Sequence, residues 1–271
     1  MTPKNVTDPT IALRLIEEFK TKSTLSNCFL MSTELEKLIR KECLWYVING
    51  RNAFFLEDKG NCFRIHYMIN DERRDFPWVT DKPLMLEILF RGKDGEPEQE
   101  ISYWENQKFS RNLVRNNLTA RYADLILSPC DKNSDIHIAQ NEAECRFAEL
   151  LFKDSFDPYS GDYIDSDEFE VLFRDRKILI ASCDGNSCGA LHFYNVGRCA
   201  WIGHVAVTPD ARGRGLGPAL IREFIRLNYV DDKSRYALWV QSQNQAANAM
   251  YERFGFKYAD KSSLSMIKET Y

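Results

Sequence analysis

The sequence predicts an α+β fold built from two domains in tandem. The chain has 271 residues, nearly twice the roughly 150 expected of one domain. Each half contains two segments with helical spacing of apolar residues, followed by several short strand-like segments. A stretch of polar and turn-forming residues, 128–134, separates the two halves. We therefore expect an N-terminal domain at 1–127, a linker at 128–134 and a C-terminal domain at 135–271.

Composition and charge are typical of a soluble globular protein. Apolar residues make up 44% of the chain and charged residues 28%, which excludes a disordered or fibrous chain. The formal net charge is −4, so a strongly basic nucleic-acid-binding domain is not expected. No apolar run approaches the ~18 residues of a membrane span, and the first residues lack the apolar core of a signal peptide. We predict a cytoplasmic protein with no nucleic-acid or membrane partner.

The eight cysteines and four histidines do not follow the spacing of a metal site. No two cysteines form a CxxC pair, and the histidines are scattered, so we predict no bound metal. Cys183 and Cys188 flank an Asp-Gly pair that is typical of a hairpin turn. We expect reduced thiols, most of them buried.

The first half begins with a helix whose start is marked by Asp8, an N-cap residue followed by a proline. A second helix is predicted at 32–41, and residues 98–118 are predicted as helical or mixed. The pair Asn49-Gly50 is typical of a hairpin turn. Strands are expected at 44–48, 53–56, 63–69 and 84–90.

The second half repeats this order of elements. Helices are predicted at 139–152 and 165–173, the second with Asp165 and Glu168 spaced as a capping box. A strand–loop–helix unit lies at the centre of this half. Further strands are expected at 177–182, 190–195, 201–208, 237–241 and 264–268, and further helices at 216–228 and 245–254.

The most informative stretch, 205–217, joins a buried strand to a helix through a glycine-rich loop. Glycines let the backbone turn tightly and let an anion approach closely. The first N–H groups of a helix lack intrahelical partners and, with the helix dipole, suit a pyrophosphate. Arg212 and Arg214 add positive charge. The loop matches neither a P-loop nor the GxGxxG dinucleotide fingerprint. A plain helix start and an RNA contact through the two arginines remain alternatives.

A second segment, 238–256, completes a family pattern. Together the two segments resemble the GNAT superfamily of acyl-CoA-dependent N-acyltransferases. Arg212, Gly215 and Gly217 match its R/Q-x-x-G-x-G/A signature. The second segment matches its strand, Asn, Ala, Tyr and Gly-Phe pattern at Val240, Asn244, Ala247, Tyr251, Gly255 and Phe256.

The resemblance covers about residues 135–271 and implies a mixed, mostly antiparallel central sheet flanked by helices. The order of elements in 1–127 is similar, so a degenerate GNAT-like domain is expected there. This half has no Arg-x-x-Gly-x-Gly element. We therefore expect it to hold no CoA in the usual way and to wall the acceptor site or stabilise the other domain.

The resemblance also implies acetyl-CoA as co-substrate and a primary amine, on a small molecule or a peptide, as acceptor. The pantetheine arm of acetyl-CoA would lie along the strand predicted at 201–208, where a backbone N–H would polarise the thioester oxygen. Tyr251 would be the general acid that protonates the departing thiolate. The implied cofactor-binding residues are Val205, Ala206, Val207, Arg212, Gly213, Arg214, Gly215, Leu216, Gly217 and Asn244.

The general base is where this sequence departs from the family. Many members keep a Glu or His two or four residues before the position of Val205, and here these positions are Gly203 and Trp201. His204 is the neighbouring candidate base, and a structural histidine is the alternative. Strand alternation places His204 on the opposite face, unless a bulge re-aims it. Pro218 removes one N–H from the helix start, which should not prevent cofactor binding.

Seven carboxylates fall between Asp154 and Glu170 with no Lys or Arg among them. An acidic rim of this kind would concentrate a cationic amine, and the alternative is a solvated loop with helix-start carboxylates. Polyamines, aminoglycosides, amino acids and protein amines all stay open as acceptors. The competing function is a CoA-binding or regulatory module that has kept the fold and lost turnover.

Overall fold

The computed structural model describes residues 2–78, 80–127, 135–159 and 164–269. The chain divides into two compact units. Unit 1 comprises Met1–Val114, Tyr159–Tyr163 and Ser262–Tyr271, and unit 2 comprises Arg115–Pro158 and Ile164–Lys261. The predicted linker, 128–134, lies outside the described residues. Two of the boundaries between the units fall within long strands, one in β7 (Ser110–Arg121) and one in β13 (Lys257–Lys268).

Unit 1 is built on a mostly antiparallel sheet with strand order β1-β3-β4-β5-β6-β13, in which β5 and β6 alone run parallel within the described residues. Side chains alternate between its two faces, so Phe54 and Phe55 enter different apolar clusters. The elements are β1 (Lys4–Asn5), α1 (Pro9–Phe19), β2 (Leu25–Ser26), α2 (Ser32–Arg40), β3 (Leu44–Asn49), β4 (Asn52–Asp58), β5 (Phe63–Ile69), β6 (Leu84–Phe90) and α3 (Glu98–Asn106).

The parallel strands β5 and β6 pair only at Phe63↔Leu84 and Arg64↔Met85. Beyond these pairs β2 takes the edge of β5, through Leu25↔Ile69 and Ser26↔Met68.

The next residue, Asn27, bridges the two separating strands. Its Nδ2 donates to Ile65 O and Glu87 O, both at 3.0 Å, and its Oδ1 accepts from Tyr67 N at 2.7 Å. The segment 25–27 therefore fills the space between β5 and β6 with protein hydrogen bonds.

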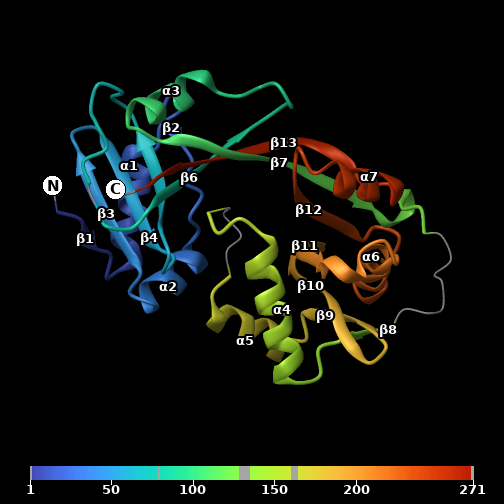
Figure 1. Cartoon of the computed structure of the whole chain (residues 1–271). Coiled ribbons are helices and arrows are strands. Elements are labelled where there is room, and N and C mark those ends of the chain that lie inside the picture. The colour runs from blue at the N-terminus through green and yellow to red at the C-terminus, as the bar shows by residue number, and fades with distance from the viewer. Residues whose placement is uncertain (1, 79, 128–134, 160–163, 270–271) are drawn as a thin grey trace. The chain divides into compact units, whose positions relative to one another are not determined.

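In unit 2 the strand order is β7-β12-β11-β10-β9-β8, again mostly antiparallel, with one parallel pair, β11–β12, among the described strands. Helices α4 and α5 pack on one face and α6 on the other (Figure 1). The elements are β8 (Asp135–Ile138), α4 (Glu142–Ser155), α5 (Ser166–Arg174), β9 (Ile178–Cys183), β10 (Asn186–Val196), β11 (Cys199–Val207), α6 (Leu216–Leu227), β12 (Arg235–Gln241) and α7 (Gln245–Arg253).

The predicted α+β class and the repeated order of elements are confirmed. The Asp8 side chain accepts from Thr10 N at 2.8 Å and caps α1, and Asn49-Gly50 connects β3 to β4. The prediction for 98–118 is only partly right, because α3 ends at Asn106 and β7 begins at Ser110. No helix in the described ranges combines the length and apolar character that crossing a bilayer requires.

Candidate active site

The candidate site begins where two parallel strands of unit 2 separate. β11 and β12 pair from Cys199↔Arg235 to Ile202↔Leu238. Both strands continue, to Val207 and Gln241, but the pairing between them ends. On its other edge β11 stays paired with β10 as far as Val207. The last five residues of β11 thus expose one backbone edge toward the side from which β12 has diverged.

The hydrogen bonding shows which residues point to that edge. Thr208 N donates to Cys188 O of β10 at 2.9 Å. Because alternate residues of an antiparallel strand face the same partner, the backbone groups of Ala206 face β10 and those of Val205 and Val207 face the opposite edge. Val205 and Val207 are the residues that the sequence predicts to pair with an extended ligand.

The glycine-rich loop follows this edge. Gly213 and Gly215 have φ of 79° and 78°, a region that side chains other than glycine rarely adopt. A Cβ built on either glycine meets no atom of the described structure within 4 Å. Gly215 is the N-cap of α6, so the following N–H groups, except that of Pro218, point out of the helix start. An open, donor-rich surface of this kind fits a pyrophosphate.

Helix α7 lies beside the end of this loop. A Cβ on Gly217 would lie 3.5 Å from the Met250 sulfur. Asn244 caps α7, with its Oδ1 accepting from Ala247 N at 3.0 Å, so its Nδ2 is the group left to reach a ligand. Asn248 secures the turn by donating to Gln241 O at 3.0 Å.

Tyr251 of α7 is buried, with 4% of its surface exposed. It belongs to the apolar cluster on the α6 side of the sheet, against which Val205 and Val207 also pack. No hydrogen bond to its hydroxyl is formed by the described residues. Burial raises the pKa of Tyr251 well above its usual value, so the phenol carries its proton at neutral pH.

The register of β10 and β11 shifts at Gly203. His192 pairs with His204, whereas Phe193 pairs with Ile202, which leaves Gly203 as an extra residue on β11. This is a β-bulge, and it reverses the alternation of the side chains that follow.

His204 consequently lies on the α4 side of the sheet, with its ring 4.3 Å from Phe156 and 5.5 Å from Phe152. Ile202 lies on the α6 side. Simple strand alternation would place His204 on the face of the sheet opposite to Trp201. This expectation is wrong, because the bulge at Gly203 turns the His204 side chain to the same face as Trp201.

His204 is hydrogen-bonded to a second buried histidine. The distance from His192 Nε2 to His204 Nδ1 is 2.7 Å. Burial and the positive charge of Arg115 lower the pKa of His204 to about 3, and burial next to His204 lowers that of His192. Both rings are neutral at pH 7. Sequence reasoning missed His192, although Gly203, a glycine inside a strand, is the signal of close packing that could have revealed it.

The acidic segment is only partly described, because Asp162 lies outside the described residues. Asp165 and Glu168 form the predicted capping box, with Glu168 N donating to Asp165 at 2.8 Å. Their role in attracting an amine stays a prediction. In the part of the chain that the structure describes, no group of three or more His, Cys, Asp or Glu side chains is arranged to hold a metal ion.

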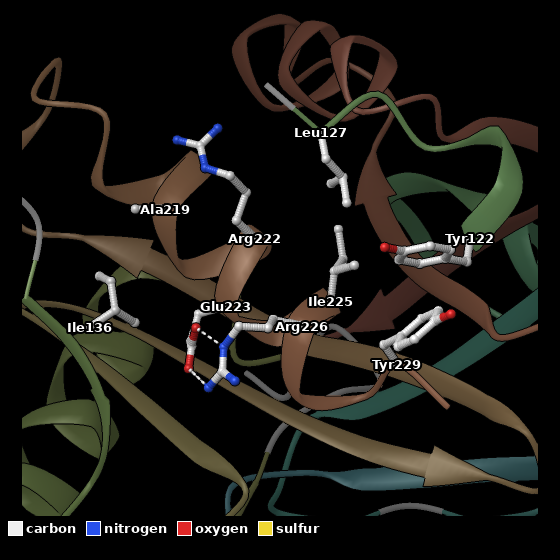
Figure 2. Close-up of a pocket in the computed structure, with 9 residues that line it drawn as sticks. All are labelled: Tyr122, Leu127, Ile136, Ala219, Arg222, Glu223, Ile225, Arg226 and Tyr229. Carbon is white, nitrogen blue, oxygen red and sulfur yellow. Dashed lines mark hydrogen bonds and ion pairs between the residues drawn. The ribbon is translucent and has the colours of Figure 1, made fainter. Parts of the chain in front are cut away.

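A pocket of about 400 Å³ lies elsewhere in unit 2. Figure 2 shows that it is lined by residues of α6 and by the rings of Tyr122 and Tyr229. Arg226 forms two hydrogen bonds with Glu223 at 2.6 and 2.8 Å, and the two tyrosine rings lie 4.2 Å apart at a tilt of 46°. None of the predicted cofactor-binding residues lines it. This pocket is therefore separate from the candidate site.

Comparison with known proteins agrees with this geometry. Residues 144–256 match the acetyltransferase (GNAT) family. An uncharacterized N-acetyltransferase of Methanocaldococcus jannaschii is 33% identical over 107 residues, which are 38% of this chain and 46% of that protein. A putative ribosomal-protein-alanine N-acetyltransferase of Bacillus subtilis is 32% identical over 79 residues, 29% of this chain and 52% of that protein. The chain thus spans about half the length of the curated relatives it matches.

Solved structures show the same fold over nearly the whole chain. A GCN5-related N-acetyltransferase from Sphaerobacter thermophilus has a TM-score of 0.63 at 13% identity, covering 99% of this chain and 95% of that one. A tandem GNAT protein from the clavulanic acid biosynthesis pathway has a TM-score of 0.54 at 13% identity, covering 99% and 90%. The fold is a two-domain GNAT-like fold, and residues 144–256 are the part of the chain that matches the GNAT acetyltransferase family.

Proposed function

We propose that unit 2 binds acetyl-CoA and transfers its acetyl group to a primary amine by direct attack. The observation that carries this proposal is the divergence of β11 from β12 directly before the glycine-rich start of α6. One backbone edge and one helix start then form a continuous line of donors, suited to an amide-bearing arm and a pyrophosphate.

The chain's own groups have distinct tasks in this proposal. Val205 and Val207 bind the pantetheine amides through their backbone, and Asn244 adds a side-chain donor. The loop N–H groups from Gly213 to Gly217 hold the pyrophosphate, and Arg212 and Arg214 add charge. A backbone N–H on the open edge of β11 stabilises the thioester oxygen as negative charge develops there.

Tyr251 acts when the carbon–sulfur bond breaks. The amine nitrogen forms a bond to the acetyl carbon, and the sulfur leaves with the bonding electrons. Tyr251 donates its proton to that sulfur, which a phenol held in its protonated form is suited to do. The amine loses one proton in the same sequence of events.

The acceptor of the amine proton is a separate question. His204 can serve as base only if its pKa rises from about 3 toward neutrality in the complex, which the like charge of a cationic amine opposes. Our preferred scheme delivers the amine already deprotonated, through solvent or the acidic segment. His204 as base is the second scheme, and the two differ in the pH dependence of the rate.

The acceptor class is an amine on a small molecule or a protein. The Bacillus subtilis relative is named for an alanine of a ribosomal protein, and we carry over to this chain only the wider class. The acidic segment favours a cationic amine over an anionic one.

Calorimetry and thiol detection together test the proposal. We expect acetyl-CoA and CoA to bind at micromolar to millimolar concentration, and an amine panel to release free thiol from acetyl-CoA in the presence of the protein. The proposal fails if neither ligand binds at millimolar concentration.

A CoA-binding module without turnover is the second candidate. The observations that favour it are the absence of a carboxylate at Trp201 and Gly203 and the lowered pKa of His204. Cofactor binding with no thiol release across small polyamines, aminoglycosides, amino acids and protein amines would establish this function instead.

A further inference from the structure

The proposed function gives no task to His192, although the fold makes special room for it. Only 3% of its surface is exposed. A Cβ on Gly203 would lie 1.8 Å from His192 Cε1, so no other residue at position 203 leaves space for the imidazole. The bulge that turns His204 toward α4 is thus the feature that brings the two rings together.

An apolar cage surrounds the pair. The ring of Phe152 lies 5.5 Å from both histidines, Phe169 lies 6.4 Å from His192, and Phe156 lies 4.3 Å from His204. Phenylalanine rings offer no strong hydrogen-bond partner. A rotation of either imidazole would therefore give up the one strong bond that the pair makes.

The hydrogen bond between the rings restricts where the protons lie. At a nitrogen–nitrogen distance of 2.7 Å, one neutral ring donates and the other accepts. His192 Nδ1 is buried and has no partner among the described residues. If His204 donates, His192 must bury an unpaired N–H at Nδ1, whereas if His192 donates, Nδ1 is a bare acceptor. Either arrangement leaves one N–H of the pair outside this bond, at His192 Nδ1 or at His204 Nε2. Of these two atoms only His192 Nδ1 is among the buried unpaired atoms, and an unpaired N–H costs most where it is fully buried, so His192 is the donor.

We propose that His192 is a positioning residue that fixes the tautomer of His204 and makes it present Nε2 as an N–H donor on the α4 side of β11. The proposal rests on the proposed acetyl transfer, to which it adds a specificity element. An N–H directed at the attacking nitrogen would occupy the lone pair that attack requires. The group that His204 recognises is therefore an oxygen of the acceptor, such as a hydroxyl, carbonyl or carboxylate near the amine.

Nitrogen NMR of the protein with labelled histidine reads the tautomer without any ligand. We expect His204 to be protonated at Nε2 and unprotonated at Nδ1 at pH 7, with signals assigned by comparison with the His204→Phe and His192→Phe proteins. A His204 protonated at Nδ1 overturns the proposal. This measurement needs neither cofactor nor turnover. Its result on the tautomer of His204 therefore remains valid even if acetyl transfer itself is disproved.

Kinetics distinguish positioning from a purely structural role. His192→Phe fits the aromatic cage but removes the donor, and we expect kcat/KM for an oxygen-bearing amine to fall about tenfold, the value of one hydrogen bond. KM for acetyl-CoA should not change. His192→Gln is the matched control, because its amide nitrogen can donate from a similar position and should restore most of the activity.

The double variant completes the test. If His192 acts through His204, adding His192→Phe to the His204→Phe protein causes no further loss. An equal loss in both backgrounds shows that His192 only supports packing and overturns the proposal. An amine without a nearby oxygen should show little effect of either substitution.

Discussion

Each unit of the chain contains one pair of parallel strands that separate, and the two pairs have different fates. In unit 2, β11 diverges from β12 after Ile202↔Leu238, and a glycine-rich helix start follows. In unit 1, β5 diverges from β6 after Arg64↔Met85, and β2 with Asn27 fills the opening. The described residues between β5 and β6 form no helix. We therefore expect diverging strands to provide a ligand site only where the edge stays open.

The helix that follows the second strand of each pair, α3 after β6 and α7 after β12, also differs between the units. α3 and α7 each have nine residues. The seventh residue of α7 is Tyr251, a phenol that can donate a proton, whereas the seventh residue of α3 is Trp104, a fully buried indole. Among its described residues, unit 1 therefore has neither an open edge between β5 and β6 nor a tyrosine at the position of α3 that corresponds to Tyr251. The comparison predicts that cofactor binding and turnover belong to unit 2 alone.

The largest effect is expected for Tyr251→Phe. The substitution removes one hydroxyl and keeps the ring that packs in α7, so folding should persist. We expect kcat to fall about 10²–10⁴-fold with little change in KM for acetyl-CoA, because a positioned acid acts only in the transition state.

Tyr236→Phe is the matched control. It removes a buried hydroxyl from the same apolar cluster, where Tyr236 donates to Ile225 O at 3.2 Å. It should reduce stability by about 1 kcal/mol and leave kcat nearly unchanged. Equal activity of the Tyr251→Phe enzyme and the wild type would exclude Tyr251 as the acid.

Asn27→Ala tests the filled opening in unit 1. Three backbone groups lose their side-chain partner, and unsatisfied buried groups cost about 1–3 kcal/mol each. We expect the free energy of unfolding, measured with denaturant, to fall by about 3 kcal/mol. The exposed Asn186→Ala is the control and should change it little.

Cofactor stoichiometry belongs to the same test. Calorimetry should give one CoA per chain for both the wild type and Asn27→Ala, because removing one side chain does not remove β2 from the edge of β5. Two CoA molecules per wild-type chain would show that the opening in unit 1 is not closed to ligands.

Gly215→Val tests the open site in unit 2. Valine at a φ of 78° is strained, and its branched side chain enters the space where the pyrophosphate is expected. We expect the Kd for CoA to rise about 100-fold, which is about 2.7 kcal/mol. Gly185→Val is the control, since Gly185 has a φ of 79° and equally open surroundings in the β9–β10 turn. If both variants bind CoA equally well, the loop is not the pyrophosphate site.

Short stretches of sequence predicted the helix starts and turns well. The contacts that distinguish the two units, in contrast, depend on residues that are far apart in the sequence. Asp8, Asn49 and the pair Asp165–Glu168 act on neighbouring backbone, so a short window of sequence is enough to read them. Asn27 contacts residues 38 and 60 positions away, and nothing in its own neighbourhood indicates this. The face of His204 follows from a bulge that exists only because β10 and β11 pair in a particular register.

The two units also differ in their buried histidines, and the smallest effect is expected for a substitution of His204. His66 of unit 1 has a carboxylate partner, Glu57 at 3.2 Å, whereas His204 of unit 2 has a second imidazole at 2.7 Å. Burial disfavours the charged form of an imidazole. Burial and the positive charge of Arg115 lower the pKa of His204 to about 3, while an unfolded histidine titrates near ~6.5.

Between these two pH values the unfolded chain binds a proton at position 204 that the folded chain does not. Stability therefore rises with pH through this window, by at most about 1.4 kcal/mol per pH unit for this group, and the contribution is complete above pH ~6.5. His204→Phe should make the loss of stability on acidification from pH 7 to 5 shallower. Its rate should stay within about tenfold of wild type, and the pH profile of kcat/KM should follow the pKa of the amine in both proteins. A limb near pH 6–7 in the pH profile of kcat that vanishes in His204→Phe would instead show that the pKa of His204 is raised in the complex and that this histidine is the base.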